Sequence, residues 1–217
     1  MNSFAELWNS LDLAAILAAL VRVVGVLLCL TVHETCHGLA AFVLGDPTAK
    51  RAHRLSFNPL HHIDWFGFAS MLLLGFGWAK PVPIDMTYFK KPKQGMAITA
   101  LAGPASNLLL AVLLLFGAKC IDRYVPFAMG WYYVYYFCLR TAALSVGLAV
   151  FNLIPIPPLD GSKVVAAVLP DRAYLRLMRY EQYGMAALLL LVWLGVGDNL
   201  LGRVIAAVYQ FLINLIF

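Results

Sequence analysis

Charged residues are scarce in this chain of 217 residues. Asp, Glu, Lys and Arg together make up 12% of it, whereas apolar residues account for 62% and the mean hydropathy is +0.80. Soluble domains average about 25% charged residues, so this chain has too little polar surface to cover a water-facing globule. The composition therefore excludes an ordinary cytosolic enzyme and a disordered protein, and it indicates a bilayer as the solvent.

The sequence also lacks a cysteine framework and a long polar segment. Its four cysteines lie in or beside apolar stretches without C-x-x-C spacing, which argues against a disulfide scaffold or a zinc ribbon. No gap between apolar runs is long enough for a soluble module, so we expect one transmembrane domain over 1–217, with a catalytic core at about 22–169. The net charge of +5 arises from short loops, so we expect no nucleic-acid partner.

The apolar runs predict an all-α polytopic membrane protein with about five transmembrane helices and one re-entrant segment. The first run, Leu13–Leu44, is too long for one perpendicular crossing, and Arg22 is expected to mark its outer interface. Trp65–Ala79 is short, glycine-rich and basic on both flanks, which favours re-entry over an oblique span. The predicted crossings are Arg22–Leu44, Gly95–Ala118, Trp131–Leu153, Tyr183–Leu194 and Asn199–Phe217.

Loop charges predict the orientation in the cell membrane. The loops 46–64, 80–94 and 160–182 carry eleven Lys and Arg residues, whereas the opposite side has Lys119, Arg123 and Arg203. Cytoplasmic loops are enriched in these residues, so the basic side is expected to face the cytoplasm.

The pentad His33-Glu34-Thr35-Cys36-His37 places three ionisable groups within an apolar run. On a helix the two histidines share one face, one turn apart, and can chelate one zinc ion, while Glu34 can take a proton from an activated water molecule. Such groups are costly inside a membrane, so function is favoured over a chance motif or a hydrogen-bonded structural histidine. Cys36 is interpreted as a packing residue.

Zinc requires a third protein ligand, and Asp160 is the acidic residue best placed to provide it. It follows the segment Asn152-Leu153-Ile154-Pro155-Ile156-Pro157-Pro158-Leu159, where prolines must end the preceding helix. Irregular backbone at membrane depth is tolerated where it is buried or lines a wet cavity. Capping of a short helix, predicted at Gly161–Leu169, is the alternative role and is compatible with ligation.

Five segments of the chain resemble the site-2 protease family of intramembrane zinc metalloproteases, and most closely its short prokaryotic members without PDZ or CBS domains. In chain order they are HETCHGLAAFVLGDPTAKR, RLSFNPLHHID, GFGWAKPVPID, AGPASN and FNLIPIPPLDG. The pentad followed by N-x-x-P-x-P-x-L-D-G in one hydrophobic chain is the specific part of the match. Trp65 and His53 depart from the family pattern, where Pro and Gly are usual, and the region beyond Asp171 matches loosely.

The resemblance implies roles for individual residues. His33, His37 and Asp160 would bind one zinc ion, with Glu34 as general acid and base. Asn152 would hold the substrate or polarise its carbonyl, although a helix-end asparagine can also bond its own backbone.

Other matched residues are assigned less directly. Gly103 and Asn107 share a helix face, where we favour packing over catalysis. His62 is interpreted as a loop residue outside the core site.

The expected function is hydrolysis of peptide bonds in or near transmembrane segments of other membrane proteins. An extended substrate could pair with an edge of the re-entrant segment or the broken helix. The alternative is a membrane protein that binds zinc or handles ions without proteolysis, although the predicted helices offer few further polar groups for an ion path. An inactive scaffold is disfavoured because Glu34 and all three ligands are present.

Overall fold

Four long apolar helices dominate the structure, a computed structural model that describes residues 13–67, 70, 79–126, 128–174, 183–184, 186, 190 and 198–217. Within this part of the chain there is no strand, only an isolated bridge between Ile63 and Ala79. Each of the four helices is long and apolar enough to cross a membrane: α2 (Leu13–Val43), α5 (Pro92–Tyr124), α6 (Met129–Asn152) and α9 (Asp198–Ile216). The all-α polytopic architecture is therefore confirmed.

The remaining predicted crossing and the re-entrant segment are not described in full. Most of Tyr183–Leu194 and of Trp65–Ala79 lies outside the described residues, so both stay predictions.

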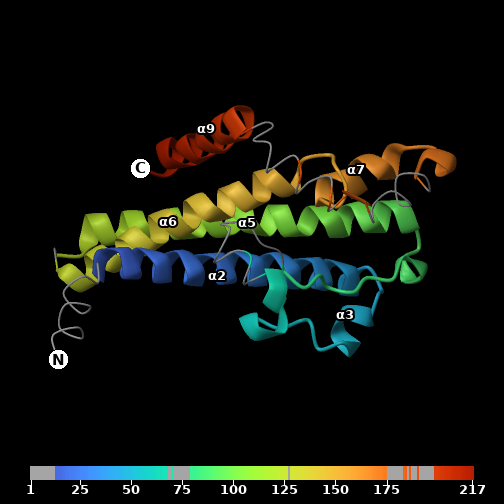
Figure 1. The fold of residues 1–217 in the computed structure, drawn as a ribbon, viewed down its shortest axis with the longest axis horizontal. Helices are drawn as coiled ribbons and strands as arrows, with labels where there is room; N and C mark the ends of the chain where they lie inside the picture. Colours follow the sequence, from blue (N-terminus) through green and yellow to red (C-terminus); the bar gives the residue numbers. More distant parts are fainter. Residues whose placement is uncertain are drawn as a thin grey trace, which may run out of the picture.

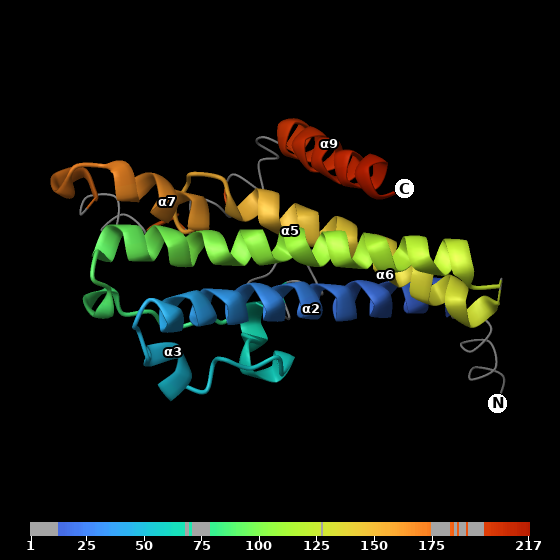
Figure 2. The same cartoon turned by 180° about the vertical axis from the view of Figure 1, so that it is seen from behind.

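The helix α5 occupies the centre of the bundle. It contacts α2, α6, α9 and the short helix α7 (Asp160–Val168). Figures 1 and 2 show α2, α5 and α6 side by side along the long axis, with α9 beside α6 and α7 near the start of α5. Buried Ala and Leu side chains of α5 pack against Ala142 and Val146 of α6, and apolar side chains of α9 cover this cluster. The small residues allow α5 and α6 to approach closely, as membrane helices do.

Two helices extend beyond the predicted crossings. The helix α2 runs without interruption past Arg22 to Leu13, so its first turns lie beyond the predicted crossing. The helix α5 exceeds Gly95–Ala118 at both ends, beginning with Pro92 in its first turn. Proline is favoured there because the first turn has no intrahelical acceptor for its missing N–H.

The end of α2 follows from the sequence Gly45-Asp46. Gly45 has φ +106°, and its N–H donates to the Phe42 carbonyl while the Asp46 N–H donates to the Ala41 carbonyl. These bonds form a Schellman motif, which requires a left-handed residue and so favours glycine. The helix thus ends within one residue of Leu44, where the predicted crossing ends.

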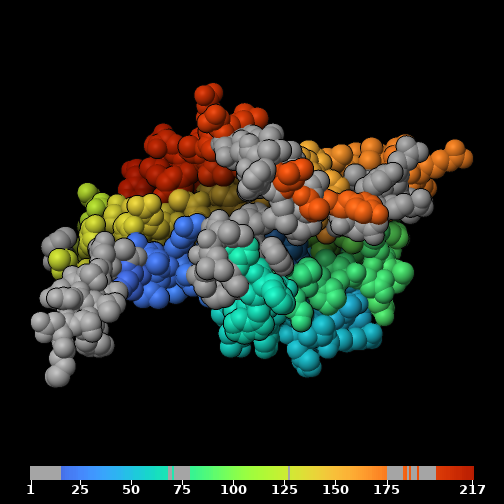
Figure 3. Space-filling model, in the orientation of Figure 1, coloured from blue at the N-terminus to red at the C-terminus, as the bar shows by residue number. Residues whose placement is uncertain are grey.

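A loop region covers one side of α2 near its C-terminal half. It contains α3 (Thr48–Arg51) and two 3-10 turns, η1 (Pro59–His61) and η2 (Met86–Tyr88). In Figure 3 the cyan to green part of this region bulges from the lower side of the bundle. The extended residues 79–85, which we call the strap, run back along this loop region. The Lys80 N–H of the strap donates to the His62 carbonyl at 2.9 Å.

Candidate metal centre

Three side chains from α2 and α7 converge inside the bundle. His33 Nε2 and His37 Nε2 lie 3.0 Å apart, and Asp160 Oδ2 lies 3.1 Å from the first and 3.2 Å from the second. His33 and His37 are 4% and 6% exposed, and Asp160 is 9% exposed. These are the three ligands that the sequence predicts, and the fold brings them together across 127 residues of chain.

The arrangement fits a tetrahedral metal ion. Zinc binds histidine nitrogen and carboxylate oxygen at about 2.0–2.2 Å, so two ligand atoms of a tetrahedral site lie roughly 3.3 Å apart. The three observed separations are close to this value, and all three ligand atoms lie within 4.8 Å of one another. Two imidazoles and one carboxylate are a protein ligand set found in catalytic zinc sites, where the fourth position is left for water or substrate.

One face of α5 lies against both imidazole rings. His37 Nδ1 lies 2.7 Å from the Thr99 carbonyl oxygen, and Asn107 Nδ2 lies 3.0 Å from His33 Nδ1. Because a carbonyl oxygen can only accept, Nδ1 of His37 donates to Thr99 and its Nε2 keeps a free lone pair. Contacts of this kind orient the histidine ligands of metal sites.

Gly103 lies between these two contacts on the same face of α5. A Cβ atom there would lie 2.5 Å from His37 Cε1 and 2.7 Å from His33 Cε1, and nearer still to His37 Nε2. Only glycine leaves room for both rings, so Gly103 sets the close approach of α5 to the histidine pair.

The broken end of α6 places Asp160 at the start of α7. Gly161 packs against the Leu153 and Ile154 backbone, where a Cβ would lie 2.5 Å from Leu153 C and 2.6 Å from Ile154 O. Glycine after Asp160 therefore lets α7 begin directly against the end of α6. Burial alone raises the pKa of the Asp160 carboxyl, but its contacts with the His33 and His37 side chains outweigh burial and hold the pKa below its usual range. An ionised carboxylate at this position can bind a cation.

Glu34 contacts the strap through its carboxylate. Its Oε2 accepts a hydrogen bond from the Val82 N–H at 3.1 Å, and its side chain is partly exposed. Val82 stands between Pro81 and Pro83, whose fixed φ angles restrict the strap. Glu34 is therefore adjacent in sequence to a ligand and held by backbone from a distant segment.

The other predicted residues lie at different distances from the cluster. Asn107, which the sequence assigns to packing, contacts His33 directly and is fully buried. Asn152 Nδ2 donates to the Leu148 carbonyl of its own helix at 2.9 Å, so its role in substrate binding stays a prediction. His62 lies outside the cluster, near the Ser56 carbonyl at 2.8 Å, as expected for a loop residue.

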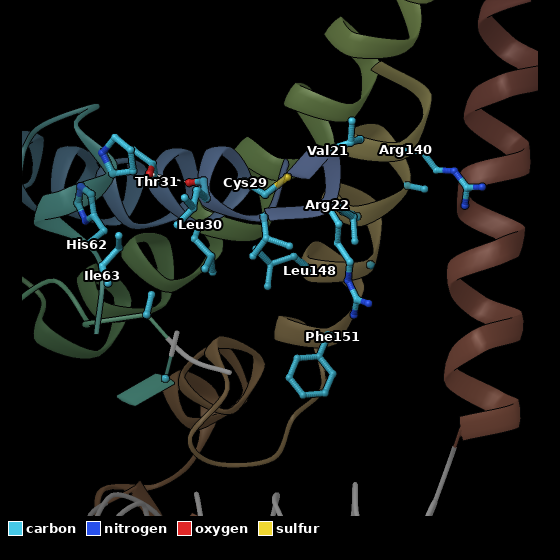
Figure 4. A pocket seen from close by; sticks show the side chains of 18 of the residues that line it. Val21, Arg22, Cys29, Leu30, Thr31, His62, Ile63, Arg140, Leu148 and Phe151 are labelled. Carbon is cyan, nitrogen blue, oxygen red and sulfur yellow. Dashed lines mark hydrogen bonds between the residues drawn. The ribbon is translucent and has the colours of Figure 1, made fainter. Parts of the chain in front are cut away.

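A pocket of about 830 Å³ opens between α2, α6 and α9. Figure 4 shows side chains that line it, with Leu30 and Thr31 of α2 on one side and Leu148 and Phe151 of α6 on another. None of the three ligand residues lines this pocket; Leu30, which does, lies three residues before His33 on α2. Leu201 and Ile205 of α9 also line it.

Similarity to known proteins agrees with the site. The model of "Peptidase family M50" matches residues 126–194. The chain is 34% identical over 184 residues to "Putative zinc metalloprotease YwhC" of Bacillus subtilis (strain 168), covering 82% of this chain and 83% of that protein. It is 30% identical over 175 residues to "Putative zinc metalloprotease Rip2" of Mycolicibacterium smegmatis (strain ATCC 700084 / mc(2)155), covering 78% of this chain and 65% of that one. No solved structure matches.

Fold and site together define a multi-pass membrane metalloprotease. The chain belongs to peptidase family M50, the site-2 protease family, and the resemblance inferred from its motifs is confirmed.

Proposed function

We propose that this protein is an intramembrane zinc metalloprotease that hydrolyses peptide bonds in or near transmembrane segments of membrane-protein substrates. The supporting observation is the convergence of His33, His37 and Asp160 inside a bundle whose helix α2 is long and apolar enough to cross a membrane. His37 lies six residues before the end of α2 at Val43, about 9 Å along the helix axis. Cleavage would therefore take place within the bilayer, near one surface.

The ligand set would hold one zinc ion per chain through His33 Nε2, His37 Nε2 and Asp160 Oδ2. When bound, zinc lowers the pKa of water towards 7 and polarises the scissile carbonyl. The Glu34 carboxylate takes the proton of the attacking water and delivers it to the leaving amine nitrogen. During this step the Val82 N–H would hold one carboxylate oxygen of Glu34, so that the other oxygen can take the proton.

The substrate would approach along α2. The pocket between α2, α6 and α9 offers room for an apolar segment beside α2. Asn152 ends α6 only eight residues before Asp160, and a change of side-chain rotamer would release its amide from the Leu148 carbonyl for the substrate oxyanion. The basic loops 46–64, 80–94 and 160–182 would face the cytoplasm of a cell whose plasma membrane holds the protein.

Glu34→Gln tests the proposal directly. The variant keeps the size of the side chain and an acceptor for the Val82 N–H, but it cannot take a proton. We expect it to retain zinc and to cleave a transmembrane reporter at least 100-fold more slowly than the wild type, about the size of a general-base contribution. Reporter fragments identified by mass spectrometry would also locate the cleaved bond.

Cys36→Ala is the matched control, since Cys36 lies in the same pentad without belonging to the ligand cluster. It should cleave at close to the wild-type rate. A Glu34→Gln variant that retains zinc and cleaves as fast as Cys36→Ala would contradict the proposed mechanism.

A further inference from the structure

Asn107 is a completely buried polar residue that contacts a proposed metal ligand from outside the ligand set. It is 0% exposed, and its Nδ2 lies 3.0 Å from His33 Nδ1. Its Oδ1 has no hydrogen-bond partner within the described part of the chain. A buried amide oxygen without a partner is costly. This cost indicates that the Asn107 amide has a second orientation, in which Oδ1 is hydrogen-bonded.

The chemistry of the imidazole defines the second arrangement. In the structure the amide donates to Nδ1, which places the ring proton of neutral His33 on Nε2. A metal on Nε2 requires the lone pair of that nitrogen, so the ring proton must then lie on Nδ1. The Asn107 atom opposite Nδ1 must therefore become an acceptor.

A half-turn of the amide about the Cβ–Cγ bond provides that acceptor. It exchanges Oδ1 and Nδ2 without changing the volume that the side chain occupies. We infer that Asn107 is a positioning residue whose Oδ1 accepts a hydrogen bond from His33 Nδ1–H in the zinc-loaded protein. This inference rests on the proposed function, because it requires His33 Nε2 to bind zinc.

The contact to the second histidine supports this role. The Thr99 carbonyl already accepts from His37 Nδ1 at 2.7 Å. Thr99, Gly103 and Asn107 follow one another at intervals of four residues, so they form one face of α5. That face would supply one hydrogen-bond acceptor for each histidine ring. Gly103, between the two acceptors, leaves room for the rings themselves.

The backbone of Asn107 is held in place as well. Ser145 Oγ of α6 donates to the Asn107 carbonyl at 2.7 Å, and Ser145 is also fully buried. This hydrogen bond fixes the axial position of α5 relative to α6 at the level of His33. The amide thus projects from a part of α5 that two neighbouring helices constrain.

The test compares zinc affinity in purified full-length variants, with the zinc dissociation constant measured by competition against a chromogenic chelator. Asn107→Leu has a similar size but no acceptor, and we expect it to weaken zinc binding about 10- to 100-fold, as loss of an outer hydrogen bond to a histidine ligand does. Asn107→Asp keeps an acceptor oxygen, and we expect its affinity to stay within about threefold of the wild type or to rise. Asn107→Ala makes the same comparison if the leucine variant does not fold.

Two controls separate this inference from the proposed function and from packing. Ser106→Ala alters the next residue, whose hydroxyl bonds the Gly103 carbonyl, and it should bind zinc as the wild type does. His33→Ala should lose zinc whatever Asn107 does, so failure of that result would overturn the ligand set itself. Wild-type affinity in Asn107→Leu, or equal losses in Asn107→Asp and Asn107→Leu, would overturn the inference about Asn107 while leaving the ligand set intact.

Discussion

Gly103→Ala adds a single methyl group between the two proposed histidine ligands. The new Cβ would lie 2.5 Å from His37 Cε1, whereas ordinary van der Waals contact begins at 3.4 Å. The helix α5 would have to retreat by about 0.9 Å, or the rings would have to turn by a similar distance. The rings belong to a ligand set with separations of 3.0–3.2 Å, so they have little freedom to turn.

The free energy of unfolding and the zinc affinity should respond differently to this substitution. Overpacking costs about 1–3 kcal/mol, and the higher helix propensity of alanine returns about 1 kcal/mol. The net loss of unfolding free energy is therefore at most about 2 kcal/mol. Zinc affinity should fall by about 10- to 100-fold, because Gly103 touches both rings whose orientation the metal requires.

Gly117→Ala provides the matched control within the same helix. A Cβ at Gly117 meets no atom within 4 Å, so this variant should bind zinc and cleave a reporter as the wild type does. Zinc competition titrations and reporter cleavage on both purified variants measure the difference. Wild-type zinc affinity and cleavage in Gly103→Ala would refute the claim that α5 approaches the histidine pair too closely for a side chain.

Two further variants test the surroundings of the site. Asn152→Ala should lower the kcat of reporter cleavage about 10- to 100-fold with unchanged zinc affinity, because it removes an amide proposed to act on the developing oxyanion; unchanged kcat would exclude that role. Asp46→Ala should lower the free energy of unfolding by about 1–3 kcal/mol, because the buried carboxylate accepts from the Thr48 N–H at 2.8 Å and the Asp85 N–H at 2.7 Å. Thermal unfolding measures this loss, and a shift no larger than that of Asp85→Ala would contradict it.

The sequence predicts the ligand set because few charged residues lie among its apolar runs. His33 and His37 are recognisable from their spacing on one helix face, and Asp160 from the proline-broken segment before it. Their convergence to within 4.8 Å agrees with the zinc site inferred from the motifs. The end of α2 just before Gly45 is also predictable, since the turn that follows the helix needs a residue that adopts positive φ.

Other contacts depend on how the helices pack, which the sequence does not encode locally. The Thr99 carbonyl and the Val82 N–H are backbone groups, so the identity of these residues gives no signal of their contacts with His37 and Glu34. Asn107 could be placed on a helix face with Gly103, but its contact with His33 follows only from the register of α5 against α2. The helix α5 continues past the apolar run at both ends. It can do so because the charged side chains of its first and last turns reach water.

The zinc content of purified protein tests the central claim most directly. Elemental analysis of the wild type should find one zinc ion per chain, and Asp160→Asn should lose most of it because the carboxylate oxygen is one of only three proposed protein ligands. Wild-type protein without zinc, or an Asp160→Asn variant that retains one zinc ion per chain at wild-type affinity, would contradict the account.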